Sequence, residues 1–378
     1  MGRPTHQALF ESGNLPIKHD GDVHDGKVRS VYWLTSEDSG RLIDQRGYRV
    51  PNDTPLGLMV ISDRLSAFDV IWKGEGGLNG VPGKGAVLNA FTEHWFEGLE
   101  TVSGAPHHIL DKPHPLAWIV QRAEPIMVEG VMRAYITGSM WRAYARGDRE
   151  FCGISLPDGL EKNQQLDRLL FTPTTKGVLN IPGIPTGDDA PISVEQILGQ
   201  YAAFGFRTPE DVTAYRSLVN TGFTHIGALL AEQGQLFVDT KFELGYLKGS
   251  DGSSVLGYMD EAGTPDSSRI WSRSSYAGSQ EHPTEHSKEG FRQFLLELQG
   301  VQGYGNAEVR DILLNKGRME ERRAFAAEYD VPLATMMRVS DTYRGILRHV
   351  TGRTFDLSEN PRTELLDALN GDQYRLVS

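Results

Sequence analysis

Charged side chains suited to binding a metal ion gather on one predicted hairpin. The segment LFVDTKFELGYL is typical of a β-strand, in which side chains alternate, so one face carries Asp239, Lys241 and Glu243. The following KGSDGSS is a turn sequence, and a hairpin symmetric about residues 251 and 252 would place Glu243 opposite Asp260. Facing carboxylates repel each other, so either one of them is protonated or a cation lies between them.

Magnesium is the cation that these residues suit. It takes oxygen ligands and often binds one or two carboxylates together with substrate phosphates. Lys241 lies on the same face and would suit an anionic substrate. Two solvent-exposed acids on an edge hairpin would give the same pattern, and this stretch alone leaves that alternative open.

The turn TPDSSR, which follows Asp260, adds groups that bind anions. It is expected to bring Asp266, Ser267, Ser268 and Arg269 back towards the end of the hairpin. Arginine offers a planar fork for phosphate or carboxylate, and serine hydroxyls can donate to phosphate oxygens. A helix cap or an Asx-turn beside a surface arginine is an equally common use of such residues.

A second cationic cluster is expected in EGVMRAYITGSMWRAY. Arg133 follows an apolar strand, and the turn at Thr137 to Ser139 precedes a predicted helix over 139–146. A helix N-terminus with free N–H groups, a serine and a nearby arginine is a good phosphate receptor. Ser139 acting only as a helix cap would fit this stretch as well.

Glycine-bounded loops in the first half add further charged residues. GDVHDGKVRSVYWL is not a P-loop, because Val28 replaces the required Ser or Thr and a strand follows the lysine. Its Gly-Lys turn between strands could still cover nucleotide phosphates. ISDRLSAFDV and GVPGKGAVLN contribute Asp63, Ser66 and Lys84, among glycines that indicate special backbone angles or a mobile flap.

The composition restricts the classes of protein that these sites could belong to. With 378 residues, 39% of them hydrophobic and 23% charged, the chain is an ordinary globular protein with room for two or three lobes. The net charge of −12 argues against a nucleic-acid or membrane-surface binder. A single cysteine, an opening without a signal-peptide core and no apolar run near ~18 residues favour a cytoplasmic protein without membrane spans.

The elements that must position these residues alternate between strands and helices. Strand-like segments dominate the first half, at 28–34, 56–62, 68–72 and 116–132. Helical spacing occurs at 86–99, 193–203 and 209–233 and from 288 onward. The polar segment 35–55 is expected to be a long hairpin excursion. Together the segments predict an α+β enzyme with a cleft between lobes and a helical tail.

Seven stretches together resemble the motifs of the SAICAR synthetase family of purine biosynthesis. They are GKVRSVY, SDRLSAFDV, PGKGAVLN, EPIMVEGVMRAYITGS, FTPTTK, DTKFELG and DEAGTPDSSRIW. They occur in the family's order and cover roughly residues 26–294. The tail stretch LATMMRVSDTYRGILRHVTG also resembles the closing helix of the family.

The resemblance implies a two-lobed fold related to ATP-grasp enzymes and protein kinases. ATP would lie between a β-rich ATP-binding lobe (1–125) and a central α+β catalytic lobe (126–287), with a C-terminal helical region (288–378) packed on both. The implied enzyme is an ATP- and Mg²⁺-dependent ligase that joins CAIR (carboxyaminoimidazole ribonucleotide) to L-aspartate. The products would be SAICAR, ADP and phosphate, formed through an acyl phosphate.

The resemblance also implies a role for each matching residue. ATP would contact Lys27, Arg29, Met127, Val128 and Glu129, the last three lining the adenine pocket. Magnesium would be held by Glu243 and Asp260. The catalytic residues would be Asp239, Lys241 and Asp266. The substrates would be bound by Arg133, Ser139, Arg269, Ser267, Asp63, Ser66, Lys84 and Lys176.

Two other functions remain open from the sequence. A small-molecule kinase could use the same Gly-Lys turn and acidic pair, although the second anion cluster and the full motif order favour the ligase. A nucleotide-binding module without activity should have lost phosphate or metal ligands, which Lys241, Glu243 and Asp260 contradict. Ser30 departs from the family, whose members often carry an acid there. The oligomeric state stays open.

Overall fold

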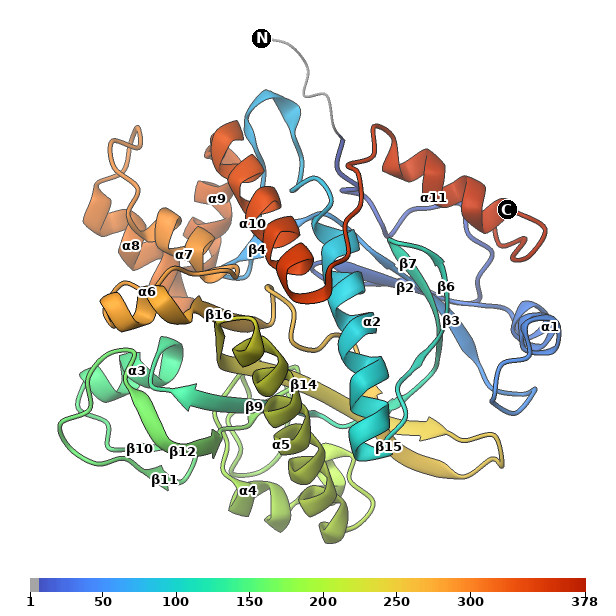
Figure 1. Cartoon of the computed structure of the whole chain (residues 1–378), viewed down its shortest axis with the longest axis horizontal. Helices are drawn as coiled ribbons and strands as arrows, with labels where there is room; N and C mark the ends of the chain where they lie inside the picture. The colour runs from blue at the N-terminus through green and yellow to red at the C-terminus, as the bar shows by residue number, and fades with distance from the viewer. Residues whose placement is uncertain (1–6) are drawn as a thin grey trace.

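The first half of the chain forms a five-stranded antiparallel sheet in the computed structural model, which describes residues 7–378 (Figure 1). Residues 1–6, the start of the opening that we expected to lack a signal-peptide core, lie outside the described residues. The strands lie in the order β1 (His24–Asp25), β2 (Arg29–Trp33), β3 (Leu56–Ile61), β7 (Ala117–Gln121) and β6 (Ile109–His114). A separate pair is formed by β4 (Leu65–Ala67) and β5 (Val70–Trp72).

The segment 35–55 is not the hairpin that we expected. It contains the helix α1 (Ser36–Arg46), whose N-cap Thr35 accepts a hydrogen bond from the Asp38 amide. Gly47, in the left-handed conformation, ends the helix. Leu42 of this helix is buried in the hydrophobic core, which explains why a polar segment is ordered here.

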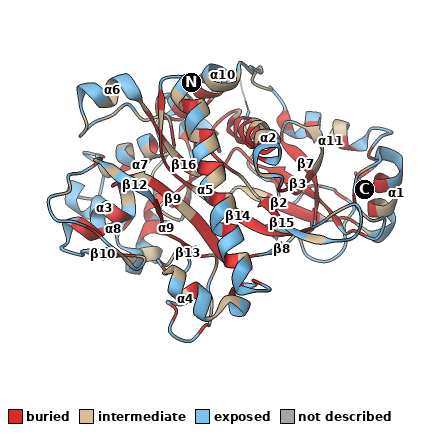
Figure 2. Ribbon diagram, turned by 60° about the horizontal axis from the view of Figure 1, so that its bottom comes forward, coloured by how far each residue is buried: buried red, intermediate tan, exposed pale blue. Residues whose placement is uncertain are grey.

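A second antiparallel sheet carries most of the predicted site. Its main path is β12 (Gln165–Phe171), β9 (Val128–Tyr135), β14 (Gln235–Lys248) and β15 (Ser254–Met259). The short strands β8 (Glu124–Pro125), β13 (Thr174–Thr175) and β16 (Ser268–Ser272) pair along its sides. Figure 2 shows β9 and β14 as mostly buried, because α5 (Pro209–Glu232) covers them. A small ribbon of β10 (Glu150–Phe151) and β11 (Ile154–Ser155) follows α3 (Gly138–Ala145).

Helices connect the two sheets to the C-terminal region. The helix α2 (Lys84–Ser103) packs on both α5 and α10 (Leu333–Thr351), as Figure 1 shows. The predicted helices at 86–99 and 209–233 are confirmed, whereas the one at 193–203 divides into α4 (Val194–Gly199) and a 3-10 turn, η2 (Tyr201–Phe204). The remaining helical elements are η1 (Glu75–Gly77), α6 (Arg273–Gly278), α7 (Glu289–Leu296), α8 (Asn306–Leu314), η3 (Lys316–Arg318), α9 (Met319–Glu328) and α11 (Pro361–Asn370).

One hydrophobic core extends through both sheets and the C-terminal helices. Trp72 of β5 packs edge-to-face against Phe291 of α7 and Phe325 of α9, which ties the tail to the first sheet. The α+β class is therefore confirmed, while the division at residues 125 and 287 stays a prediction. Within residues 7–378, no helix is both long and apolar enough to span a bilayer.

Candidate active site

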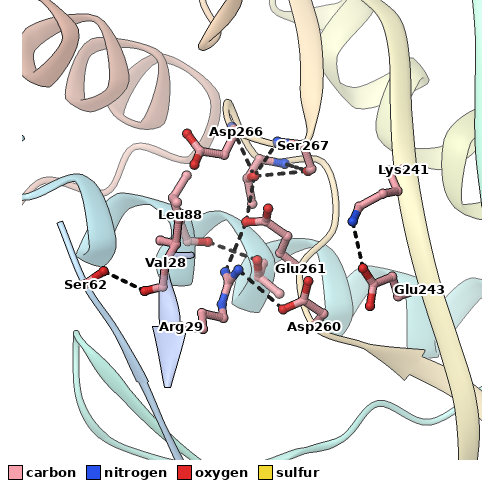
Figure 3. Close-up of polar contacts among 12 residues, drawn as sticks. Val28, Arg29, Ser62, Leu88, Lys241, Glu243, Asp260, Glu261, Asp266 and Ser267 are labelled. Atoms are coloured by element: carbon pink, nitrogen blue, oxygen red, sulfur yellow. Dashed lines mark hydrogen bonds and ion pairs between the residues drawn. The ribbon is translucent and has the colours of Figure 1, made fainter. Parts of the chain in front are cut away.

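The alternation predicted for β14 places Lys241 and Glu243 on one buried face. Lys241 Nζ lies 2.7 Å from Glu243 Oε1 (Figure 3). It also lies 2.7 Å from Glu129 Oε1. Lys176, which follows β13, forms an ion pair with the other oxygen of Glu243. Burial by itself opposes ionisation of Glu243, but the two ammonium groups hold its pKa below the usual range. Glu243 is therefore a buried carboxylate kept in its charged form.

Glu129 shares Lys241 with Glu243, but the pKa values of the two carboxyl groups are shifted in opposite directions. Thr174 Oγ1 donates to Glu129 Oε2 at 2.8 Å, and Lys241 contacts the other oxygen. Burial raises the pKa of Glu129, although the Lys241 charge opposes that shift. Lys241 and Lys176 together supply two positive charges for the two carboxylates, Glu129 and Glu243.

Asp260 lies next to this cluster but not where the hairpin symmetry put it. The register pairs Glu243 with Met259, because Lys248 and Ser254 enclose a five-residue turn centred on Asp251. Asp260 is one residue beyond the strand, with a φ of 58°. The expected opposition of Glu243 and Asp260 across the ladder is therefore wrong by one residue. The positive φ releases the Asp260 side chain from the strand alternation.

Arg29 of β2 binds the acids at the end of this hairpin. Its Nη1 lies 3.4 Å from Asp260 Oδ1, and its Nη2 donates to Glu261 Oε2 at 3.1 Å (Figure 3). The first sheet thereby contacts the second one directly at the site. Burial raises the pKa of Asp260, Arg29 opposes the shift, and the nearby charge of Glu243 adds to it.

These two carboxylates suit a divalent cation. Glu243 is buried and Asp260 is partly exposed, both supply oxygen donors, and the charge of Glu243 opposes ionisation of Asp260, a repulsion that a cation would relieve. Among residues 7–378, no group of three or more His, Cys, Asp or Glu side chains is placed to hold a metal. A magnesium ion here would therefore need further oxygens from phosphates and water, as is usual for this ion.

A second cluster joins two arginines through Asp239. Asp239 Oδ2 accepts from Arg133 Nη1 at 2.8 Å and from Arg269 Nη1 at 2.7 Å. Arg133 also donates to Thr172 Oγ1 at 3.0 Å and to Ser139 Oγ at 3.2 Å. Asp239 thus holds the two guanidinium groups side by side, and each keeps donors in reserve because arginine has five N–H groups.

The N-terminus of α3 faces this arginine pair. A Cβ built on Gly138 would lie 2.7 Å from Arg269 Nη2, so only glycine lets the guanidinium approach the helix this closely. The N-cap of α3 is Thr137 rather than Ser139. Ser139 is exposed and bonded to Arg133, which favours the phosphate-receptor interpretation over the cap. Glu289 of α7 accepts from Arg269 Nη2 at 3.1 Å and fixes its other end.

Lys84 and Asp266 lie together in the interior, apart from the open ends of both clusters. Lys84 Nζ is 2.8 Å from Asp266 Oδ2, and the two side chains are 0% and 4% exposed. Lys288 approaches the same oxygen at 3.3 Å, and Tyr343 Oη donates to Asp266 Oδ1 at 2.8 Å. Lys84 and Asp266 are thus both enclosed by protein partners, and the expected substrate contact of Lys84 stays a prediction. Ser267 is half-buried in the loop beside Thr264, and the two hydroxyl oxygens are 3.1 Å apart.

The remaining predicted residues of the first lobe, Lys27, Ser66 and Asp63, have separate surroundings. Lys27 lies in the turn between β1 and β2, 53% exposed, and pairs with Asp69 at 2.6 Å. Ser66 is buried in β4. Asp63 accepts hydrogen bonds from the backbone amides of Leu9 and Gly85, each at 2.8 Å. Both oxygens of Asp63 are therefore used to hold the protein backbone.

Asp63→Asn is expected to destabilise the fold and to leave substrate binding unchanged. The amide nitrogen would face a backbone N–H, so a buried hydrogen bond is lost at a cost of about 2 kcal/mol. Thermal unfolding and the KM for CAIR should be measured together, with the exposed Asp53→Asn as the control. An unchanged unfolding temperature with a raised KM would return Asp63 to the substrate site.

The backbone expected to contact adenine already makes bonds within the protein. The Met127 amide donates to the Phe204 carbonyl at 2.8 Å, and the Met127 carbonyl accepts from the Lys176 amide at 3.2 Å. The Val128 carbonyl accepts from Tyr215 Oη at 2.7 Å. An adenine contact at Met127 and Val128 stays a prediction, whereas Glu129 enters the Lys241 cluster through its side chain.

Several residues of the site were not predicted. Thr172, Thr174 and Glu261 lie beside the expected residues in sequence, and their position next to a charged motif was the available signal. Glu289, Lys288 and Tyr343 come from the helical tail. Their sequence neighbourhood gives no sign of a site, since only tertiary packing brings them to the arginines and to Asp266.

Comparison with known proteins gives a consistent result. The sequence model of a family described as SAICAR synthetase matches residues 22–306. The phosphoribosylaminoimidazole-succinocarboxamide synthase of Shewanella amazonensis is 56% identical over 371 residues, covering 98% of each chain. The enzyme of that name from Vibrio parahaemolyticus is 52% identical over 374 residues, covering 99% of each.

Solved structures share the fold at lower identity. SAICAR synthase from Saccharomyces cerevisiae, in complex with SAICAR, superposes with a TM-score of 0.62 and 23% identity, covering 90% of this chain and 98% of that one. A SAICAR synthetase in complex with ADP gives a TM-score of 0.54 and 17% identity, covering 89% and 100%. At these identities the structures bear on the fold alone.

Proposed function

This chain belongs to the SAICAR synthetase family and is an ATP-dependent ligase that joins CAIR to L-aspartate in purine biosynthesis, and we propose that its two charged clusters divide that reaction between them. The cluster around Glu243 would bind the reacting phosphates of ATP. The cluster around Asp239 would bind the ribose phosphate of CAIR. Both clusters lie on the same face of β14, where Glu243 and Asp239 are four residues apart, which is about 13 Å along a strand.

In the first cluster, Glu243 and Asp260 would hold Mg²⁺, and Lys241 and Lys176 would contact phosphate oxygens. The metal supplies charge neutralisation of the phosphates when it is bound. The lysines carry positive charge next to the same carboxylate and can turn towards an incoming phosphate, since their side chains are 31% and 28% exposed. Arg29 keeps Asp260 oriented from the first sheet. Such prearranged charges favour phosphoryl transfer because they need no reorganisation during the reaction.

In the second cluster, Arg133, Arg269 and Ser139 would grip the phosphate of CAIR. Asp239 and Glu289 hold the guanidinium groups in place and would not touch the substrate. Charge-assisted hydrogen bonds from two planar forks suit a dianionic phosphate. The N-terminus of α3 adds a favourable dipole beside them.

The reaction itself would proceed through an acyl phosphate. A carboxylate oxygen of CAIR attacks the γ-phosphorus of ATP, and the bond to the ADP oxygen breaks. The amine of L-aspartate then attacks the carbonyl carbon, the bond to the phosphate oxygen breaks, and the amine loses a proton as the amide forms. The protein has no covalent part in this sequence, so positioning and charge must provide the acceleration.

The observation that carries this division is the common β14 face, on which Glu243 pairs with two lysines and Asp239 pairs with two arginines. The test measures ADP release with ATP, Mg²⁺ and CAIR, with and without L-aspartate, and identifies the product by mass spectrometry. We expect stoichiometric ADP only when both substrates are present. ADP release that does not require aspartate would indicate a kinase. No ADP release under any condition would indicate a binding module.

CAIR labelled with ¹⁸O in its carboxylate tests the acyl phosphate separately. If a carboxylate oxygen attacks phosphorus, one ¹⁸O atom must appear in the inorganic phosphate released per turnover. Unlabelled phosphate together with normal SAICAR formation would exclude the acyl phosphate and leave the ligase activity in place.

A further inference from the structure

We propose that Tyr343, in the C-terminal helix α10, is a positioning residue for the Arg29–Asp260 contact, acting through Asp266 and the loop between β15 and β16. This inference rests on the proposed role of Asp260 at the phosphate site. Tyr343 is 1% exposed and lies in a part of the chain to which the reaction assigns no contact. The tail would then contribute to the site without touching a substrate.

Asp266 is the point at which the tail and the loop meet. Its side chain contacts Lys84, the first residue of α2, Lys288, which precedes α7, and Tyr343 of α10. Three elements from distant parts of the sequence are thus fixed to one carboxylate. Burial opposes its charge, but Lys288 and Lys84 hold the pKa of Asp266 well below its usual range, so it is ionised.

Tyr343 has a part in this cluster that neither lysine can replace. Lys84 and Lys288 both approach Oδ2 of Asp266, whereas Tyr343 donates to Oδ1 at 2.8 Å. Within the described chain, Lys84 Nζ has no partner in hydrogen-bond geometry, so its contact is one of charge alone. A charge contact permits rotation of the carboxylate, while a directed hydrogen bond on the other oxygen fixes its plane.

A chain of hydrogen bonds in the loop connects Asp266 to the Arg29–Asp260 contact. The Asp266 amide donates to Thr264 Oγ1 at 3.3 Å, and Thr264 Oγ1 donates to Glu261 Oε2 at 3.0 Å. The same Glu261 oxygen accepts from Arg29 Nη2 at 3.1 Å, and Arg29 Nη1 lies 3.4 Å from Asp260 (Figure 3). Asp260 has a positive φ and stands beyond the ladder, so this network orients it in place of the strand.

The arginine cluster does not depend on the loop in the same way. Arg269 lies in β16, where Asp239 is its direct partner across the ladder. Its guanidinium is fixed by Asp239 and Glu289. A disturbance of Asp266 should therefore affect the phosphate site of ATP more than the phosphate site of CAIR. An effect on the ATP phosphate site without an equal effect on the CAIR phosphate site distinguishes a positioning role from a loss of structure throughout the site.

The test compares Tyr343→Phe with wild type in the full-length protein. Without ligands, hydrogen exchange of the peptide over residues 260–268 should become faster. The Mg²⁺ concentration for half-maximal activity should rise about tenfold, as for partners that orient ligands, while the KM for CAIR changes less than about twofold. Calorimetry with Mn²⁺ and a non-hydrolysable ATP analogue gives the same comparison without turnover.

The matched control is Tyr374→Phe. Tyr374 is also a buried tyrosine of the tail that donates to a carboxylate, Asp111, at 3.1 Å, but that carboxylate lies in the edge strand β6 of the first sheet. It should leave the exchange of 260–268 and the Mg²⁺ dependence as in wild type. If Tyr343→Phe fails to fold, Thr264→Val cuts the same network at its next hydroxyl and should give the same split.

Two results would overturn the proposal. One is exchange and Mg²⁺ dependence identical to wild type in a folded Tyr343→Phe protein. The other is an equal rise in the KM for CAIR, which would mean that the substitution loosens the whole site. A wild-type protein without aspartate-dependent turnover would contradict the proposed function instead, and the exchange measurement would still test the network.

Discussion

Glu243→Gln is expected to lower kcat by roughly 100-fold, equivalent to about 2.7 kcal/mol of transition-state stabilisation, in a protein that still folds. The substitution keeps the shape of the side chain and removes its charge. It would weaken the carboxylate pair proposed for Mg²⁺ and release Lys176 and Lys241 from their shared anchor. The two lysines are partly exposed and can take up water, so the fold should survive the loss.

The Mg²⁺ dependence of the remaining activity decides what Glu243 does. If it is a metal ligand, the Mg²⁺ concentration for half-maximal rate should rise and excess Mg²⁺ should restore part of the rate. A 100-fold loss with unchanged Mg²⁺ dependence would make Glu243 an anchor for the lysines only. Asp251→Asn, at the exposed turn of the same hairpin, is the control and should be close to wild type.

The residues on β14 could be predicted because their signal is local. The alternation of Asp239, Lys241 and Glu243 needs only the period of an extended chain, and the structure places all three on one face, each in an ion pair. The short motif at Arg133 to Ser139 was equally informative, since a strand, a tight turn and a helix follow directly in sequence. Family motifs in order then identified the fold and the reaction.

Other features could not be read from local sequence. The position of Asp260 depended on whether the hairpin turn held an odd or an even number of residues, and a shift of one residue moves a side chain to the other face. Its positive φ then removes it from the alternation altogether. The helix in 35–55 was missed because a mostly polar helix has few apolar residues to show its period.

Burial of Lys84 and Asp266 illustrates a different limit. In sequence, both lie in glycine- or serine-rich loops, which is typical of residues that contact substrates. Their enclosure depends on Lys288 and Tyr343, which follow Asp266 by 22 and 77 residues. The local sequence around a charged loop residue does not indicate which distant helix will pack over it. The same limit applies to Glu289 beside Arg269.

Arg269→Ala is expected to raise the KM for CAIR about 30-fold, equivalent to about 2 kcal/mol, and to change kcat much less. The guanidinium is already fixed by Asp239 and Glu289, so a phosphate that reaches its unused donors costs little side-chain entropy. Within the described residues, its Nε is buried and has no hydrogen-bond partner, which leaves at least this donor for a ligand.

Two further variants show whether the effect on KM depends on the planar guanidinium and on its position. Arg269→Lys keeps the charge but loses the planar fork, so its KM should fall between wild type and alanine. Arg273→Ala, four residues further on and exposed, removes an arginine of the same region and should leave the KM for CAIR unchanged. If Arg269→Ala binds CAIR as wild type does, Arg269 is a structural partner of Asp239 and Glu289. The phosphate must then be held by Arg133 and the start of α3 alone.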